Sequence, residues 1–273
     1  MSGSPPAVHP TAVVFPGARL GEAVRVGPHS VVGEHVVVGP KTVLEANVYL
    51  GGWTTVGAEN TFGPGGVVGT EPQDVGYRGE PTRVVIGDRN VFREYVTVHR
   101  ATAKEDGLTQ IGHGNYFMAF SHVAHDCRVG DETIFLHGAT LGGHVRVGDF
   151  AIVGAMSAVH QFCRLGRFSF MGGGSMVTLD VAPFSRVAGQ RPTRYLGLNS
   201  VGLRRRGFSR ERIAALKDMF RLLFEADLNT SQALARIEAE IPASEDREEL
   251  VSFVRSSKRG VVKKAAAWDA DSE

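Results

Sequence analysis

The sequence of 273 residues lacks several features that would place it in a special class of proteins. No apolar run approaches the roughly 20 residues that a helix needs to cross a bilayer. The first residues show no basic segment followed by an apolar one, as a secretion signal would. We therefore expect a cytoplasmic protein that does not span a membrane. The formal net charge is only +1, so we expect no nucleic-acid partner, which would normally call for a basic excess.

Cysteine is scarce as well, whereas glycine is abundant. The two cysteines, Cys127 and Cys163, lack metal-ligand spacing, so we interpret them as buried thiols rather than as a disulfide. The 34 glycines are concentrated in a repeat, where turns need residues that tolerate positive φ. The hydrophobic fraction of 42% is large enough to form a sizeable core.

An apolar residue recurs at every sixth position over most of the chain. The first series comprises Val8, Val14, Leu20, Val26, Val32, Val38, Leu44, Leu50, Val56, Phe62 and Val68. The second comprises Ile111, Phe117, Val123, Val129, Phe135, Leu141, Val147, Val153, Val159, Leu165, Met171 and Val177. This period fits neither a strand nor a helix. It is typical of a parallel β-helix built from hexapeptides, in which one repeat buries its apolar face only by stacking on the next.

Two segments interrupt the repeat, at residues 70–82 and 99–110. Both are polar and rich in turn-forming residues. Insertions in a solenoid are expelled as loops, and such loops often line the binding face. We therefore expect both segments to wall a cleft.

The repeat fades after Val177, and helical patterns follow. A first helix is expected after Ser209, a second from about Ser231 to Ile241, and a third after Ser244. The predicted organisation is a mainly β domain over residues 1–190 and a small α-helical domain over residues 191–273.

Five short stretches carry a resemblance to a known family. They are Gly-Glu-Pro-Thr-Arg at 79–83, Ile-Gly-Asp-Arg-Asn at 86–90, His-Val-Ala-His-Asp-Cys at 122–127, Ala-Val-His-Gln-Phe-Cys at 158–163 and Arg-Arg-Gly-Phe-Ser-Arg at 205–210. With the repeat and the helical end, they resemble the UDP-N-acetylglucosamine O-acyltransferases of lipid A biosynthesis. The resemblance implies left-handed coils and a homotrimer with active sites between adjacent solenoids. It also implies transfer of an (R)-3-hydroxyacyl chain from acyl carrier protein to the 3-hydroxyl of UDP-N-acetylglucosamine.

Acyl transfer from a thioester to an alcohol needs a base for the hydroxyl proton and a donor for the developing oxyanion. The resemblance assigns the base to His125, and the adjacent Asp126 would orient the imidazole and stabilise its protonated form. It assigns the oxyanion donor to the backbone N–H of Gly143, where the missing Cβ lets the backbone approach the substrate. Direct attack on the thioester is a single displacement, so neither a nucleophilic residue nor a cofactor is expected.

Further positions match residues that contact substrate in the family. They are Gln73, Asp74, His122, His144, His160, Gln161, Gly173, Asn199 and Arg205. Gly173 matches the floor of the acyl pocket, and a glycine leaves that pocket long, so we expect a long-chain donor. Acyl carrier proteins are acidic, so we also expect a basic docking surface. Its candidate residues are Arg204, Arg206, Arg255, Lys258, Arg259, Lys263 and Lys264.

Two alternatives remain open at the level of sequence. Val201 stands where well-known family members carry an acidic residue, which leaves room for an N-acyltransferase acting on a 3-amino UDP-sugar. The histidines at 122, 125, 144 and 160 also allow a zinc solenoid like the γ-carbonic anhydrases. Their spacing by nearly whole coils favours alignment along a cleft over convergence on one ion, so no metal is expected. A non-catalytic scaffold would leave the His125–Asp126 match unexplained.

Overall fold

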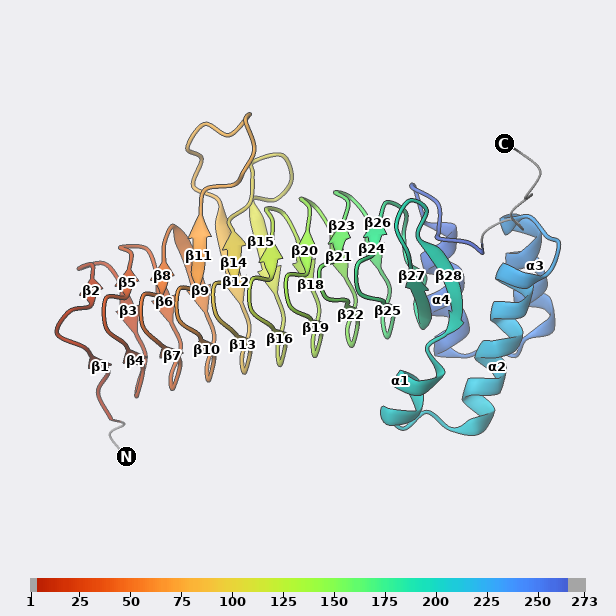
Figure 1. Cartoon of the computed structure of the whole chain (residues 1–273), viewed down its shortest axis with the longest axis horizontal. Coiled ribbons are helices and arrows are strands. Elements are labelled where there is room, and N and C mark those ends of the chain that lie inside the picture. Colours follow the sequence, from red (N-terminus) through yellow and green to blue (C-terminus); the bar gives the residue numbers. More distant parts are fainter. Residues whose placement is uncertain (1–3, 265–273) are drawn as a thin grey trace.

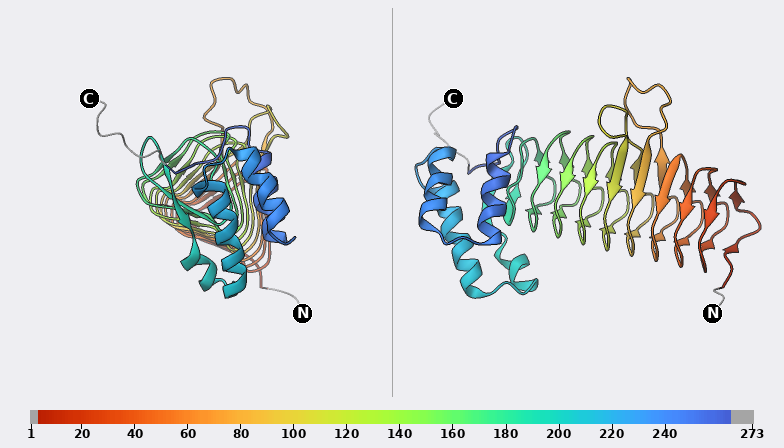
Figure 2. Two further views of the ribbon diagram at one scale, coloured as in Figure 1. Left: turned by 90° about the vertical axis from the view of Figure 1, so that its right-hand side faces the viewer. Right: turned by 180° about the vertical axis from the view of Figure 1, so that it is seen from behind.

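The computed structural model describes residues 4–264, so the outermost residues of both predicted domains lie outside the described part. Three parallel sheets wind together as one elongated solenoid, and helices lie at its C-terminal end (Figure 1). Seen along its axis, the solenoid is a prism of stacked coils (Figure 2). Within residues 4–264, no helix combines the length and apolarity needed to cross a membrane.

Each turn of the solenoid adds one short strand to each of three sheets. Sheet A comprises β1 (Ala7–Val8), β4 (Arg25–Val26), β7 (Val43–Leu44), β10 (Thr61–Phe62), β13 (Val91–Phe92), β16 (Tyr116–Phe117), β19 (Ile134–Phe135), β22 (Ile152–Val153), β25 (Phe170–Met171), β27 (Ser185–Ala188) and β28 (Arg194–Leu198). Sheet B comprises β2 (Val13–Val14), β5 (Val31–Val32), β8 (Tyr49–Leu50), β11 (Val67–Thr70), β14 (Thr97–His99), β17 (His122–Val123), β20 (Thr140–Leu141), β23 (Ala158–Val159) and β26 (Met176–Val177). Sheet C comprises β3 (Arg19–Leu20), β6 (Val37–Val38), β9 (Trp53–Val56), β12 (Arg83–Ile86), β15 (Leu108–Ile111), β18 (Arg128–Val129), β21 (Arg146–Val147) and β24 (Arg164–Leu165).

The six-residue repeat determines which side chains fill the interior. Val8 pairs with Val26 and Val26 with Leu44, so one coil takes 18 residues, or three repeats. From Val26 to Val177 the repeated apolar residues are all buried, which confirms the predicted parallel β-helix. Val8 is 44% exposed because no coil precedes it among the described residues.

A ladder of buried amides runs along the inner side of the corner between sheets C and A. The Oδ1 atom of Asn60 accepts two hydrogen bonds of 2.9 Å from the backbone and side chain of Asn90. Asn90 accepts the same pair from Asn115, and Asn115 accepts bonds of 2.7 and 2.6 Å from Thr133. The ladder therefore satisfies buried polar groups that the strands do not pair.

The two insertions leave the solenoid at one corner, between sheets B and C. Val68 pairs with Val98, 30 positions further on, and Ile86 pairs with Ile111, 25 positions further on, in place of the usual 18. The extra residues project as two neighbouring loops while the coils continue beneath them (Figure 1). These loops span the two segments in which the sequence interrupts the repeat.

The C-terminal part closes one end of the solenoid. Strand β27 pairs parallel with β25 and antiparallel with β28, so the predicted boundary after residue 190 falls inside this hairpin. The helices are α1 (Ser200–Arg205), α2 (Arg210–Phe220) with its π-helical extension η1 (Arg221–Glu225), α3 (Thr230–Glu240) and α4 (Glu245–Arg255). The three predicted helices correspond to α2, α3 and α4. Helix α1 was not predicted, because its six residues carry no apolar period.

A buried ion pair attaches α4 to the solenoid. The Asp180 side chain is 2% exposed and accepts hydrogen bonds from Arg164 Nε at 2.9 Å and Ser257 Oγ at 2.8 Å. The same Arg164 donates to the carbonyl of Phe253 at 2.8 Å, and its guanidinium lies 4.2 Å from the centre of that ring. The end of α4 is thereby held beside sheet C.

Candidate active site

The candidate site lies at the corner between sheets B and C, in two successive coils and the inserted loops beside them. His125 and Asp126 occupy the turn after β17, and Gly143 and His144 occupy the equivalent turn one coil later. Asp126 and His144 have positive φ values of 61° and 62°, because the second position of each such turn is left-handed. The 18-residue coil therefore stacks these predicted residues directly on one another.

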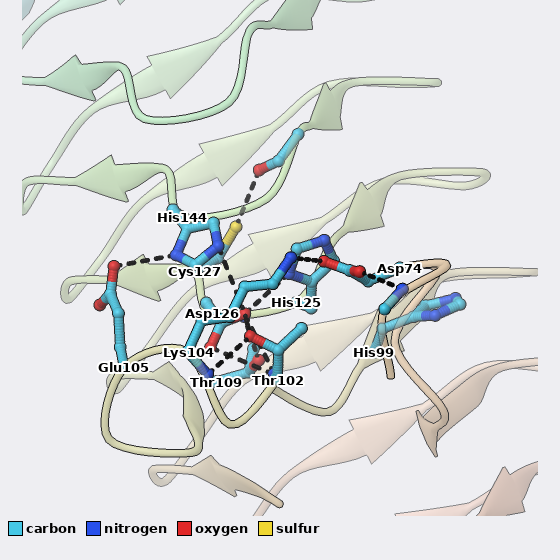
Figure 3. Close-up of polar contacts among 12 residues, drawn as sticks. Asp74, His99, Thr102, Lys104, Glu105, Thr109, His125, Asp126, Cys127 and His144 are labelled. Atoms are coloured by element: carbon cyan, nitrogen blue, oxygen red, sulfur yellow. Dashed lines mark hydrogen bonds and ion pairs between the residues drawn. The ribbon is translucent and has the colours of Figure 1, made fainter. Parts of the chain in front are cut away.

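His125 and Asp126 form a hydrogen-bonded pair, as predicted. His125 Nδ1 lies 2.7 Å from Asp126 Oδ2, and the two residues are 9% and 1% exposed (Figure 3). Burial favours a raised pKa for Asp126, but hydrogen bonds from His125 and from the backbone and hydroxyl of Thr102 outweigh it and hold the pKa below its usual value. Asp126 is thus a carboxylate that accepts the Nδ1 proton, which leaves Nε2 of His125 as the basic nitrogen.

Gly143 lies directly beneath the imidazole of His125. A Cβ at this position would come within 2.5 Å of His125 Cε1 and 2.7 Å of Nε2, so any larger residue would displace the ring. Within residues 4–264 the Gly143 N–H donates to no other group. The predicted oxyanion donor is therefore free to bind a ligand next to the predicted base.

His144 lies between two carboxylates. Its Nδ1 is 2.9 Å from Glu105 Oε1, and its Nε2 is 3.6 Å from Asp126 Oδ2. The ring of Phe162, from the next coil, stacks on the His144 ring, and the two ring centres lie 4.4 Å apart. Atoms of His125, Asp126 and His144 approach within 4.8 Å of one another, which is close enough to hold a metal ion. The expectation that no metal is bound stays a prediction.

The first inserted loop brings Asp74 to the same corner. Asp74 forms an ion pair with Lys104 of the second loop and accepts a hydrogen bond of 2.7 Å from the backbone of Gly76. These two contacts lower the pKa of Asp74, and the charge of His125 contributes in the same direction. Residues of both loops thus lie at this corner, while the neighbouring Gln73 is exposed.

The remaining histidines differ in their surroundings. His122 Nδ1 lies 2.7 Å from the hydroxyl of Thr97, and its ring meets the edge of His99. Burial, with contributions from His99 and His125, lowers the pKa of His122 to about 4, so this ring is neutral at pH 7. His160 is exposed, as are Gln161 and Gly173 on nearby coils.

Asn199 and Arg205 lie at a different corner, between sheets C and A. The Asn199 amide donates to the carbonyl of Phe168 at 2.9 Å, and its oxygen accepts from Gly202 N at 3.2 Å and caps α1. Arg205 is exposed and forms no ion pair within the described residues. Helix α1 lies across the prism from the inserted loops (Figure 1). A single chain therefore does not unite these two residues with His125.

Comparison with known proteins identifies the family. Residues 180–262 match the model described as UDP-N-acetylglucosamine O-acyltransferase, domain 2, and residues 108–143 match the bacterial transferase hexapeptide model. An acyl-[acyl-carrier-protein]–UDP-N-acetylglucosamine O-acyltransferase from Stenotrophomonas maltophilia is 47% identical over 96% of this chain and 100% of its own. The chain belongs to the UDP-N-acetylglucosamine O-acyltransferase family.

Other family members support the same assignment. A relative from Thiobacillus denitrificans is 49% identical over 94% of this chain and 99% of its own. The solved structure of the UDP-N-acetylglucosamine acyltransferase from Bacteroides fragilis superposes with a TM-score of 0.90 at 39% identity, covering 93% of this chain and 99% of that one. The coils are left-handed, as in the solved family structures, and the protein is an acyltransferase.

Two residues of this acyltransferase site were missed by the sequence reasoning. Thr102 binds Asp126 and Glu105 binds His144, and both come from the second inserted loop. The one visible signal was the charged run Lys104-Glu105-Asp106 inside a segment already expected to wall the cleft. The ion-pair partner of each of these charged residues depends on the conformation of the loop, and no local sequence pattern predicts that conformation.

Proposed function

We propose that this protein transfers an (R)-3-hydroxyacyl chain from acyl carrier protein to the 3-hydroxyl of UDP-N-acetylglucosamine. The observation that carries the proposal is the buried His125–Asp126 pair beside the free N–H of Gly143. This arrangement supplies a base and an oxyanion donor within one small volume, as acyl transfer requires. The names of its relatives from Stenotrophomonas maltophilia and Thiobacillus denitrificans contain both acyl-[acyl-carrier-protein] and UDP-N-acetylglucosamine.

The proposed reaction is a single displacement. The sugar oxygen attacks the thioester carbonyl while Nε2 of His125 takes the hydroxyl proton, and a C–O bond forms. The carbonyl oxygen gains negative charge and is stabilised by the N–H of Gly143. Collapse of this intermediate breaks the C–S bond, and the departing sulfur receives the proton from His125. Asp126 stabilises the imidazolium throughout.

We further propose that the working form is a homotrimer. Asn199 and Arg205 match nucleotide-binding positions, yet they lie one corner away from His125 in the same chain. A second solenoid packed alongside would bring its own Arg205 to the His125 corner of the first. This arrangement supports a site that two subunits complete together.

The carrier protein is proposed to dock on the basic surface of the C-terminal part. Within the described residues, Arg206 and Arg255 already form ion pairs, with Glu132 and Glu238 respectively. Arg204 and Lys258 form no ion pair within residues 4–264 and are the better candidates to bind an acidic partner. The long acyl chain, the cytoplasmic location and the absence of a nucleic-acid partner stay predictions.

The deciding experiment measures acyl transfer by the purified protein. The wild type, His125→Ala and the control His9→Ala, an exposed histidine of the first coil, receive 3-hydroxyacyl carrier protein with UDP-N-acetylglucosamine. We expect transfer by the wild type and the control and a loss of about 10²–10⁴-fold in His125→Ala. A wild type that acylates only the 3-amino UDP-sugar would overturn the ester product and make Val201, exposed on α1, the first residue to test.

A further inference from the structure

Three consecutive charged residues of the second inserted loop each bind a different part of the site. Lys104 pairs with Asp74 of the first loop, Glu105 with His144, and Asp106 with Arg128 of β18. The loop is therefore tied to the first loop and to the stacked corner, through the Lys104 and Glu105 contacts drawn in Figure 3, and also to sheet C through Asp106. Of these three contacts, only the one from Glu105 reaches a residue that touches the His125–Asp126 pair.

Glu105 belongs to a continuous chain of charged and polar groups. Arg146 Nη2 lies 3.1 Å from Glu105 Oε2, and Glu105 Oε1 lies 2.9 Å from His144 Nδ1. The other side of the ring leads to Asp126 at 3.6 Å, and Asp126 binds His125 at 2.7 Å. Basic side chains alternate with carboxylates along this chain, from exposed Arg146 to buried His125.

We propose that Glu105 is a positioning residue that fixes the His144 ring against the His125–Asp126 pair. The inference rests on the proposed acyl transfer. Three contacts define the ring: Phe162 stacks on its face, Asp126 faces Nε2, and Glu105 binds Nδ1. Glu105 is the only one of these that comes from a loop, and Arg146 holds its carboxylate in place.

The consequence concerns the geometry beside the oxyanion site. His144 follows Gly143 directly, so the position of the ring that Glu105 holds is coupled to the N–H that would bind the oxyanion. Without Glu105, the ring loses one of its two anionic neighbours and the hydrogen bond at Nδ1.

Other charged and titratable groups surround the His144 ring. On the solenoid they are His125, Asp126, Glu105 and Arg146. Across a pocket of about 410 Å³ they are Arg164, Asp180, Lys258 and Arg259. Asp180 is already bound by Arg164, so Glu105 is the carboxylate in contact with Nδ1.

The test compares Glu105→Gln with Asp106→Asn. Both variants remove one negative charge from adjacent positions of the same loop, but Asp106 does not touch His144. We expect Glu105→Gln to lower kcat by about 10–100-fold with little change in KM, as removal of a residue that orients an active-site imidazole often does. Glu105→Asp should recover part of the lost rate.

Asp106→Asn is expected to keep the wild-type KM and a rate within about threefold, as surface changes usually do. Equal behaviour of the two variants would overturn the inference, since it would mean that Glu105 only helps to hold the loop. A wild-type kcat in Glu105→Gln would also overturn it. Failure of the proposed function is distinguished by an inactive wild type. Thermal unfolding of each variant excludes loss of fold as the cause.

Discussion

At the scale of single residues, the bond between Asp126 and His125 determines which imidazole nitrogen is basic. Thr102 Oγ1 and His125 Nδ1 both contact Oδ2 of Asp126. Asp126→Asn therefore removes the negative charge that stabilises the imidazolium formed when His125 accepts the substrate proton. We expect kcat to fall by about 10³–10⁴-fold with the fold retained, as for the same exchange in a serine protease triad. Steady-state rates and thermal unfolding measure both, and a near-normal rate would contradict this role of the Asp126 carboxylate.

The neutral His122 gives a second prediction at this scale. The pKa of His122 is about 4 in the folded protein, below the ordinary value of 6.5. Between these two pH values His122 is therefore protonated in the unfolded chain but neutral in the folded protein. Stability is therefore complete above pH 6.5 and is lost as the pH falls toward 4, by up to about 3 kcal/mol from this group. His99, whose pKa is also lowered, acts in the same direction. The lowered pKa of Asp126 matters only below its ordinary value of 3.8.

Urea unfolding at a series of pH values measures this dependence. In His122→Asn the free energy of unfolding should fall less steeply between pH 6.5 and 4 than in the wild type. The exposed His160→Asn should leave the slope unchanged. Equal slopes in the wild type and His122→Asn would show that His122 does not carry this pH dependence.

The site residues fall into two groups according to how far the sequence reveals them. His125, Asp126, Gly143 and His144 occupy the same two turn positions in consecutive coils, so a regular repeat and a motif suffice to place them. Thr102 and Glu105 reach the site from an irregular loop, where no period relates sequence position to direction. Asn199 was expected to bind substrate, yet in this chain both polar atoms of its amide are bound within the fold.

At the scale of elements, the buried amide ladder links neighbouring coils. Asn90→Ala would leave the backbone N–H and the side-chain amide of Asn115 without their acceptor in a fully buried corner, while Asn60 keeps the hydrogen bond from the Asn90 backbone. We expect a loss of about 3 kcal/mol, since one unpaired buried group costs about 1–3 kcal/mol. Chemical denaturation measures this loss. The matched control is Gln190→Ala at an exposed position, which should change stability by less than about 0.5 kcal/mol.

Most elements were predictable, and the exceptions share a cause. The coils, both loops and the three longer helices follow from a period or from its interruption. Strand β28 forms because it pairs antiparallel with β27, and α1 forms because Asn199 caps it against the solenoid. Both depend on contacts with residues that are brought close only by the completed coils.

At the scale of the whole molecule, the separation of His125 from Arg205 leads to a mixing experiment. His125→Ala and Arg205→Ala should each be inactive alone. A mixed trimer holds two copies of one variant and one of the other, so a site that takes His125 from one subunit and Arg205 of the partner subunit is intact at one of its three positions. Mixed trimers of co-expressed variants, purified through two different tags, should therefore recover about a third of the wild-type activity. No recovery in verified mixed trimers would mean that each site lies within one subunit.

The exposed first coil implies a direction of unfolding. Val8, Val13 and Phe15 are each more than 40% exposed, while the opposite end is closed by the helices and by the Asp180 ion pair. Because each coil contacts only its neighbours, local opening is easiest at the free end and advances one coil at a time. Amide hydrogen exchange should therefore be fastest in β1 to β3 and slow progressively toward β17. Thermal fluctuations can therefore open several of the early coils while the candidate site at the central corner stays folded.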